Sequence, residues 1–141
     1  MASDPTSDAK YYGGSAIQIT APVTVDVTDC QFLNNYSDLA TLTQPGGVIF
    51  AYDDKAVVRC NNCMFDRNYC FRSKSDNSPC GAIAVVRKKA VLYFNGCEFK
   101  NNATGTYEGN GSRYGMLMGV HTGSTIAFNN CGLHDNYGGR N

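Results

Sequence analysis

Four groups that can do chemistry lie within six residues of this chain, in the segment Cys63-Met-Phe65-Asp-Arg-Asn68. They are a thiol, a carboxylate, a guanidinium and an amide. Cys60 and Cys63 also form a C-x-x-C pair, a spacing that occurs in zinc sites and in redox-active dithiols. The sequence has no second such pair, and Cys60 aligns with apolar residues elsewhere in the chain. The segment is therefore either a small reactive site or a structural element.

The same motif occurs four times, which favours the structural interpretation. In each copy an apolar residue follows the Cys by two positions, an Asn follows it by five, and a Gly precedes it by 16. Successive cysteines are 33, 34 and 34 residues apart. The repeated residues are Gly14, Gly47, Gly81 and Gly115; Cys30, Cys63, Cys97 and Cys131; Phe32, Phe65, Phe99 and Leu133; and Asn35, Asn68, Asn102 and Asn136. A fixed period of this length indicates a repeat architecture.

Each repeat contains three short β-prone segments and no helical periodicity. In the first repeat these are residues 15–19, residues 23–27, where apolar and polar residues alternate, and residues 30–32. Asn62, Gly96 and Asn130 are expected at one corner, because Asn and Gly tolerate left-handed backbone. The pattern predicts an all-β protein, a right-handed parallel β-helix (solenoid) of about four coils. The handedness follows the strong bias of parallel crossovers.

Two regions are expected. Residues 1–12 form a polar N-terminal leader, and residues 13–141 form the four-coil β-helix, with repeats starting near residues 14, 47, 81 and 115. The variable lengths are confined to one corner, after the repeated Asn. Insertions are predicted there at residues 36–46, 69–80 and 103–114, and all three emerge on the same edge.

The repeated residues are predicted to form vertical columns. The Phe column gives an aromatic stack inside the coils, and the Cys column lies beside it in a tight corner. The Asn column forms a ladder in which each amide bonds the neighbouring coil. Stacked cysteines do not converge on one ion, so we expect neither a metal site nor a cofactor. Three vertical ion pairs are also expected: Asp26 with Arg59, Asp53 with Arg87, and Asp66 with Lys100, with Asp66 and Arg67 facing solvent.

Composition excludes several classes of function. Twelve basic and twelve acidic residues balance, so the chain has no electrostatic footprint for nucleic acid or an anionic membrane. No run of 18 apolar residues exists, and we expect no membrane span. The first ten residues lack the apolar region of a secretory signal. Either the protein stays inside the cell or the chain is a mature or excised piece.

Modifications and surface contacts are predicted at the variable positions. Cys70 and Cys80 flank a polar insertion and form a disulfide in an oxidising compartment; the alternative is two unpaired thiols. Three sequons occur, at Asn35, Asn102 and Asn110, of which Asn110 is the best acceptor because the other two coincide with the ladder. Tyr36, Tyr69 and Tyr137 follow the ladder Asn and form either a contact stripe for sugar or protein or a packed rim.

One cluster resembles an active site. A polysaccharide lyase or hydrolase on this fold needs clustered carboxylates or a basic residue in a groove. Only Asp53, Asp54, Arg87, Lys88 and His121 provide such a cluster. We interpret them as turn residues, and no catalytic residue is assigned.

The repeats resemble those of the polymorphic outer membrane proteins of chlamydiae. The resemblance rests on the boxes Gly46-Gly-Val-Ile49 and Gly81-Ala-Ile83, each paired with an F-x-x-N motif, as in Phe65 to Asn68. It covers roughly residues 13–137; the first and last coils are looser, and Leu133 replaces Phe. It implies a right-handed β-helix at the cell surface that acts in adhesion and self-association. The family's C-terminal barrel is not found in this chain.

We therefore expect a non-enzymatic extracellular or cell-surface structural or adhesive module. Its open ends favour end-to-end pairing with another copy into a filament, unless the chain is cut from a longer array. Glycans or a host or cell-surface protein are further partners to consider. The alternatives are a carbohydrate-active β-helix enzyme and a glycan-binding module that uses the loops and the three tyrosines.

Overall fold

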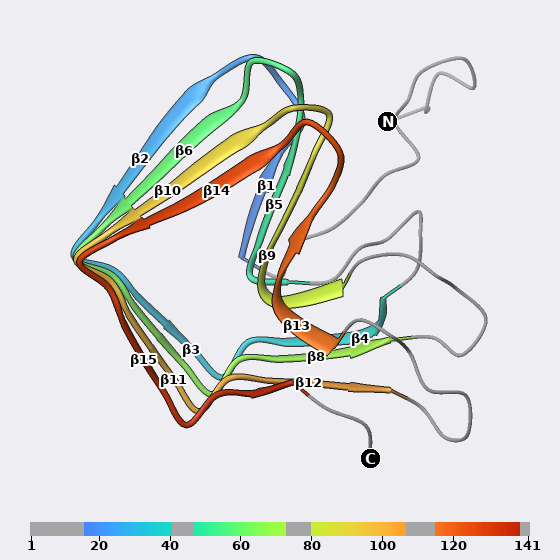
Figure 1. Cartoon of the computed structure of the whole chain (residues 1–141), viewed down its shortest axis with the longest axis vertical. Helices are drawn as coiled ribbons and strands as arrows, with labels where there is room; N and C mark the ends of the chain where they lie inside the picture. The colour runs from blue at the N-terminus through green and yellow to red at the C-terminus, as the bar shows by residue number, and fades with distance from the viewer. Residues whose placement is uncertain (1–15, 41–46, 73–79, 107–114, 139–141) are drawn as a thin grey trace.

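The computed structural model describes residues 16–40, 47–72, 80–106 and 115–138. All regular structure in these residues is β-strand, arranged in four sheets of four parallel strands. Viewed with the last coil nearest, the chain turns anticlockwise as it approaches the viewer (Figure 1). The predicted right-handed parallel β-helix of four coils is confirmed. Among the described residues, no helix is long and apolar enough to cross a membrane.

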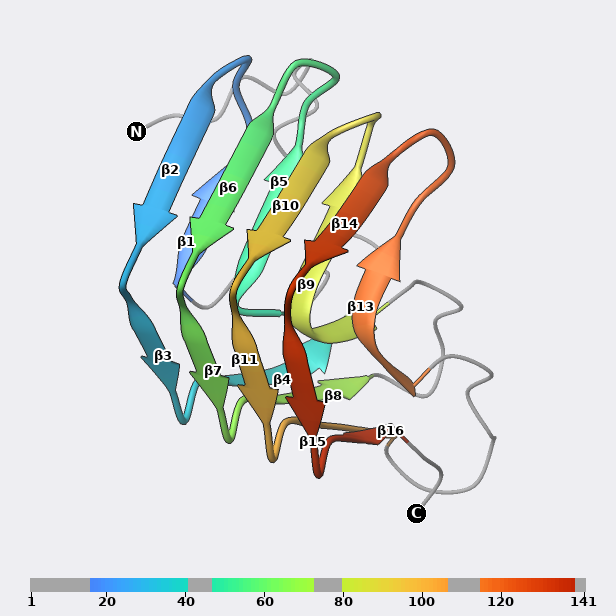
Figure 2. The ribbon, with the colours of Figure 1, turned by 60° about the vertical axis from the view of Figure 1, so that its left-hand side comes forward.

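Each coil contributes one strand to each sheet, so the four strands of a sheet lie side by side (Figure 2). Sheet A contains β1 (Ile17–Ile19), β5 (Ile49–Tyr52), β9 (Cys80–Arg87) and β13 (Gly115–Val120). Sheet B contains β2 (Thr24–Thr28), β6 (Val57–Asn61), β10 (Val91–Asn95) and β14 (Thr125–Asn129). Sheet C contains β3 (Gln31–Leu33), β7 (Met64–Asp66), β11 (Glu98–Lys100) and β15 (Gly132–His134). Sheet D contains β4 (Tyr36–Ala40), β8 (Tyr69–Arg72), β12 (Ala103–Thr106) and β16 (Tyr137–Gly138).

Sheet D corrects the prediction of three strands per repeat. The segments expected to be insertions begin as strands, and these strands pair with one another in parallel. Their sequences share no alternation of apolar and polar residues, so periodicity did not reveal them. They form because the ladder Asn before each strand places the next backbone segment beside its equivalent in the neighbouring coil.

Sheets B and C keep the register that the sequence predicts. Val25 pairs with Val58, Val58 with Leu92, and Leu92 with Ile126. At the corner between these sheets, Asn62, Gly96 and Asn130 have φ values of 52°, 61° and 52°. This confirms the expected left-handed corner.

Sheet A does not keep that register, so the expectation of a strict register throughout is wrong. Ile17 pairs with Ile49, Ile49 with Ala84, and Ala84 with Met118, which gives offsets of 32, 35 and 34 residues. The pairing of β13 with β9 also shifts between Met116 and Met118. Sheet A directly follows the segments of variable length, and its strands absorb the differences in length.

The interior is filled by the predicted aromatic column. The rings of Phe32 and Phe65 stack at 4.8 Å between centroids, and those of Phe65 and Phe99 at 5.0 Å. Phe94 of sheet B packs edge-on against Phe99 at 4.9 Å. The fully buried large side chains belong to coils two and three, because only these coils are covered on both sides.

We predict that Phe65→Ala lowers the free energy of unfolding by about 3–5 kcal/mol, because it leaves a cavity between two stacked rings. Phe32→Ala is the matched control: the same column loses the same ring, but at the partly exposed end coil. It should cost less than half as much. Urea titrations followed by circular dichroism measure both, and equal losses would show that the end coil is as well packed as the interior.

Candidate functional site

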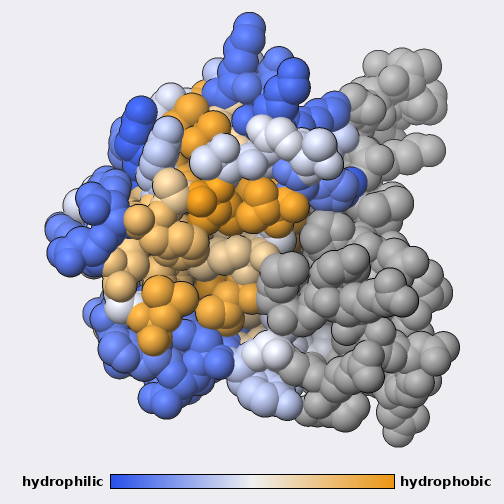
Figure 3. All heavy atoms as spheres, in the orientation of Figure 1, coloured by the Kyte–Doolittle hydropathy of each residue, from blue (hydrophilic) through white to orange (hydrophobic). Residues whose placement is uncertain are grey.

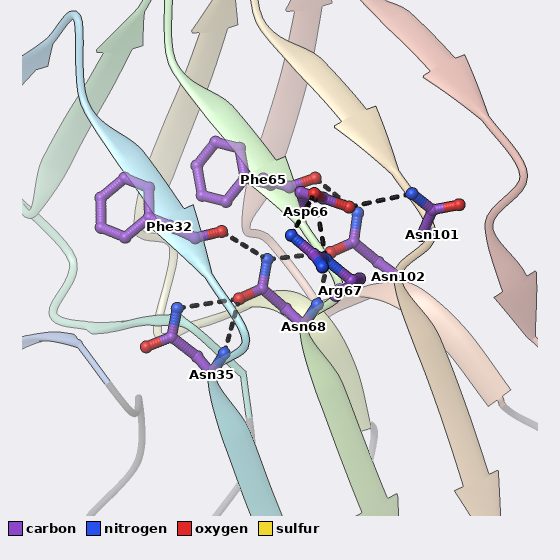
Figure 4. Close-up of polar contacts among 8 residues, drawn as sticks. All are labelled: Phe32, Asn35, Phe65, Asp66, Arg67, Asn68, Asn101 and Asn102. Carbon is purple, nitrogen blue, oxygen red and sulfur yellow. Dashed lines mark hydrogen bonds and ion pairs between the residues drawn. The ribbon is translucent and has the colours of Figure 1, made fainter.

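The asparagine column forms the predicted ladder at the corner between sheets C and D (Figure 4). The side-chain amide of Asn35 donates to Oδ1 of Asn68 at 2.8 Å, that of Asn68 to Asn102 at 2.8 Å, and that of Asn102 to Asn136 at 2.9 Å. The backbone N–H groups of Asn35, Asn68 and Asn102 donate to the same oxygens at 3.1, 2.9 and 3.0 Å. Each Oδ1 inside the ladder therefore accepts two hydrogen bonds.

The second Nδ2 hydrogen bonds the preceding coil. Asn68 donates to the carbonyl of Phe32 at 2.9 Å, and Asn102 donates to the carbonyl of Phe65 at 2.8 Å (Figure 4). Asn68 and Asn102 are fully buried, and all their amide hydrogens are used. Asp lacks the donors for this arrangement, and an apolar residue would leave the neighbouring backbone carbonyl unpaired. The amide is therefore required by the geometry.

The ladder has a direction and two unequal ends. Every amide donates toward the coil that follows it in the sequence. Among the described residues, no donor reaches Oδ1 of Asn35. In the same part of the chain, the backbone N–H of Asn136 has no acceptor, and its Nδ2 makes one bond, to the carbonyl of Phe99 at 2.8 Å. Coil one thus presents an acceptor and coil four presents donors.

The two end faces are apolar. In coil four, Phe128 is 45% exposed and Leu133 is 52% exposed, although their equivalents in coils two and three are fully buried. Figure 3 shows this face of the molecule: an apolar centre over β13, β14 and β15, bordered by hydrophilic corner residues. In coil one the interior residues Val25 and Phe32 are likewise only partly buried. Each end also presents the outer edge of a parallel strand in every sheet.

The cysteine column lies inside the corner between sheets B and C. Each thiol donates to backbone carbonyls; Cys63 donates to Asn61 at 3.3 Å, and Cys97 donates to Cys60 at 3.3 Å. Burial raises the pKa of the Cys97 thiol to about 11, and burial also raises the pKa of the Cys60 and Cys63 thiols. These thiols are protonated at neutral pH, whereas nucleophiles and metal ligands are thiolates. In the described part of the chain, no three His, Cys, Asp or Glu side chains converge as metal ligands.

The acid and base of the opening motif are structural as well. We expected Asp66 to face solvent, and this is wrong: its residue is 7% exposed. Its carboxylate accepts hydrogen bonds from Nδ2 of Asn101 at 2.9 Å and from Nε of Arg67 at 3.2 Å. The hydrogen bond from Asn101, followed by the nearby charges of Arg67 and Lys100, lowers the pKa of Asp66. Of the two charged residues in the motif, only Arg67 is exposed.

The predicted vertical ion pairs have different outcomes. Asp26 and Arg59 are aligned and lie 3.6 Å apart, as expected; both are exposed, so the pair contributes about 0–1 kcal/mol. Asp66 and Lys100 are aligned in sheet C. The alignment of Asp53 with Arg87 is wrong, because the shifted register of sheet A places Arg87 beside Tyr52.

The cluster at the corner between sheets A and B consists mainly of turn residues. Oδ1 of Asp53 accepts the backbone N–H of Lys55 at 3.0 Å and closes a turn. Arg87 is 8% exposed, and its guanidinium lies 5.7 Å from the centre of the Tyr52 ring, on which Lys88 also lies at 4.4 Å. Burial, with the charge of Arg87, lowers the pKa of His121. Asp53 is thus engaged in its own turn, and the basic side chains pack on an aromatic ring.

The tyrosines and sequons lie beside the ladder. Tyr36 and Tyr69 are paired in sheet D and stack at 6.1 Å between ring centroids. Ala103 separates them from Tyr137, so the stripe is interrupted in coil three. A glycan on Asn102 would require the buried Nδ2 that bonds Phe65 and Asn136, and Asn35 is likewise engaged through its Nδ2.

Two predictions fall outside the described residues. Asn110 is one of them. The other is the Cys70–Cys80 disulfide, because the side chain of Cys80 is not among those described. Cys70 is fully buried beside Ala82 and Leu117, and the backbone of Cys80 begins β9. The disulfide stays a prediction.

Comparison of the chain with protein-family models, with curated proteins and with solved structures returned no match. The likeness to the chlamydial repeats therefore rests on the motifs themselves.

Sequence reasoning identified the ladder, but not its direction. The spacing of the asparagines shows that they stack, whereas the donor and acceptor ends depend on how each amide is turned. The only signal in the sequence is that the column stops at Asn35 and Asn136.

We predict that Asn68→Ala lowers the free energy of unfolding by about 2–4 kcal/mol, because it leaves buried partners in both neighbouring coils without hydrogen bonds. Asn35→Ala is the matched control, since Asn35 has a described neighbour on one side only, and it should cost about 1 kcal/mol. Chemical denaturation measures both. Equal costs would contradict the cooperative ladder.

We also predict unequal thiol reactivity at a concentration where the chain is monomeric. Iodoacetamide at neutral pH should label the exposed Cys30 first, whereas Cys60, Cys63 and Cys97 should react only after unfolding, because buried thiols are inaccessible and protonated. Peptide mapping reads each site separately. Fast labelling of Cys60 together with Cys63 would revive the redox or metal interpretation of the C-x-x-C pair.

Proposed function

We propose that this chain is a non-enzymatic structural or adhesive β-helix module of the cell surface or extracellular space, and that it self-associates through its ends. The observation that carries the proposal is the state of the end coils. Residues that are fully buried in the middle coils lie half-exposed at the ends, next to unpaired strand edges. Such surfaces favour pairing with another chain.

The use of the polar residues supports a structural role. The asparagines bond adjacent coils, the described repeat thiols bond backbone carbonyls, and Asp66 bonds its corner. Every candidate for chemistry in the opening motif thus stabilises the coil that contains it. The placement at the cell surface and the adhesive role rest on the resemblance to the chlamydial repeats, and glycans or a host surface protein are the partners that this resemblance favours.

The carbohydrate-active alternative has less support. Asp53 is used in its own turn, and the buried Arg87 packs on Tyr52. A glycan-binding role remains the second candidate because the aromatic pair of Tyr36 and Tyr69 lies on the outer surface of sheet D, where Tyr36 is 55% exposed. Aromatic side chains combine a large apolar face with a polar group and are suited to such contacts. A glycan array with Tyr36→Ala as the control variant tests this candidate.

We predict that the purified chain forms species larger than a dimer as its concentration rises, and that electron microscopy shows filaments with the width of one β-helix. Burial of the two apolar ends drives the association, so it should weaken on cooling. Multi-angle light scattering measures the mass. A monodisperse monomer at all concentrations would refute self-association, and cleavage of acidic polysaccharides, lost in an Arg87→Ala/Lys88→Ala variant, would favour the enzyme.

A further inference from the structure

We propose that the copies join head to tail in one register, so that coil four of one copy stacks on coil one of the next and Asn136 lies beside Asn35 of the next copy. This inference rests on the proposed self-association and specifies its geometry. It starts from the hydrogen bonds that the ladder leaves open.

The open hydrogen bonds at the two ends are complementary. Within each chain, the backbone N–H and the Nδ2 of one Asn both donate to Oδ1 of the Asn in an adjacent coil. Asn136 has these donors available, and Oδ1 of Asn35 has the vacant acceptor positions, among the described residues. Turned the same way and stacked, two copies would meet with Asn136 in the donor role and Asn35 of the next copy in the acceptor role. The junction would then repeat the bonds found between every pair of coils.

The side-chain columns also continue across this junction. Extending the register of sheets B and C by one coil places Leu133 over Phe32 of the next copy, and Phe128 over Val27 of the next copy. These are interior positions whose side chains are exposed or only partly buried at the ends. In sheet D, Tyr137 would lie over Tyr36 of the next copy, which repeats the stacked pair of Tyr36 and Tyr69.

Charge does not oppose this junction. In the same register Ala127 faces Asp26 of the next copy, His134 faces Leu33 and Asp135 faces Asn34. Within the described strands and corners of sheets B and C, no two like charges meet. The last of these pairs places a carboxylate beside an asparagine amide, as Asp66 lies beside Asn101 inside the chain.

Head-to-head pairing lacks this complementarity. Two copies that met through coil one would bring two Asn35 acceptors together and would reverse the strands at the contact. Head-to-tail stacking keeps every strand parallel, and an interface of this kind does not close on itself unless the rotation between copies closes a ring. The expected product is a polar filament whose two ends differ.

Two variants with one blocked end each test the polarity on the full chain. Leu133→Lys blocks coil four, and Val25→Lys blocks coil one; in a single copy the new ammonium reaches water through the open end, but in a stack it would be buried without a partner. Tyr93→Lys is the matched control, because it introduces the same charge on the outer face of sheet B in coil three, at a side chain that is 38% exposed. Thermal melts followed by circular dichroism verify that each variant is folded.

Light scattering should find each end-blocked variant monomeric at a concentration where the unmodified chain and Tyr93→Lys assemble. An equimolar mixture of the two blocked variants should double the mass and stop at a heterodimer, because each supplies the end that the other lacks. A short bismaleimide should then link Cys131 of the Val25→Lys chain to Cys30 of the Leu133→Lys chain, because these residues align in the column.

The other results overturn the inference and are distinguishable. Dimers of Leu133→Lys alone, with Cys30 linked to Cys30, mean head-to-head pairing through coil one. Assembly of both blocked variants, or its loss in Tyr93→Lys, means lateral association through the outer faces. In both cases self-association stands and only its geometry fails. A monomeric unmodified chain at every concentration refutes the proposed function together with this inference, and means that something other than a second copy covers the ends.

Discussion

Buried amides hold the coils in register, and the rest of the structure depends on this constraint. Burying an amide without partners costs more than a hydrogen bond normally contributes. Asn68 and Asn102 avoid the cost only because each finds an identical residue one coil away at 2.8–2.9 Å. A shift of one residue would leave several buried donors and acceptors unpaired at once. The ladder therefore fixes the pairing of sheets C and D and permits the bulge in sheet A, which lies farther along the chain from each Asn.

The aromatic and thiol columns add stability that is shared between neighbouring coils. Stacked rings 4.8–5.0 Å apart match the spacing between adjacent strands, so each Phe packs on the one above and the one below. In such an array, stability is close to a sum of contacts between neighbouring coils. The middle coils have two neighbours and the end coils have one. The ends are therefore both the least stable part of the fold and the part with unused binding capacity.

This distribution explains why the groups suited to chemistry do not form a site. The thiols, the carboxylate of Asp66 and the amides are consumed by bonds within and between coils. What remains for function is the surface that repetition cannot cover: the two ends and the segments that follow sheet D. A solenoid that exposes its own repeat at each end presents to another copy the same surface that it uses internally.

The sequence by itself determined the repeat, the coil fold, and the Phe, Cys and Asn columns. A period of 33–34 residues with Phe and Asn at fixed offsets admits few other arrangements, because like residues must stack to be buried. The same reasoning identified the left-handed corner at Asn62 and Asn130. These features depend on spacing, and spacing can be read from one chain.

Only the tertiary structure decided the fourth sheet, the shifted register of sheet A, the burial of Asp66 and the direction of the ladder. The strands of sheet D have no periodic pattern, since they form because neighbouring backbones are brought together by the corner before them. The alignment of Arg87 with Tyr52 follows from a shift that strict counting misses. Asp66 is buried because Asn101 and Arg67 cover it from the corner. The direction of the ladder depends on the rotamer of each amide, and a side-chain orientation is set by its neighbours in space, which the spacing of residues along the chain does not encode.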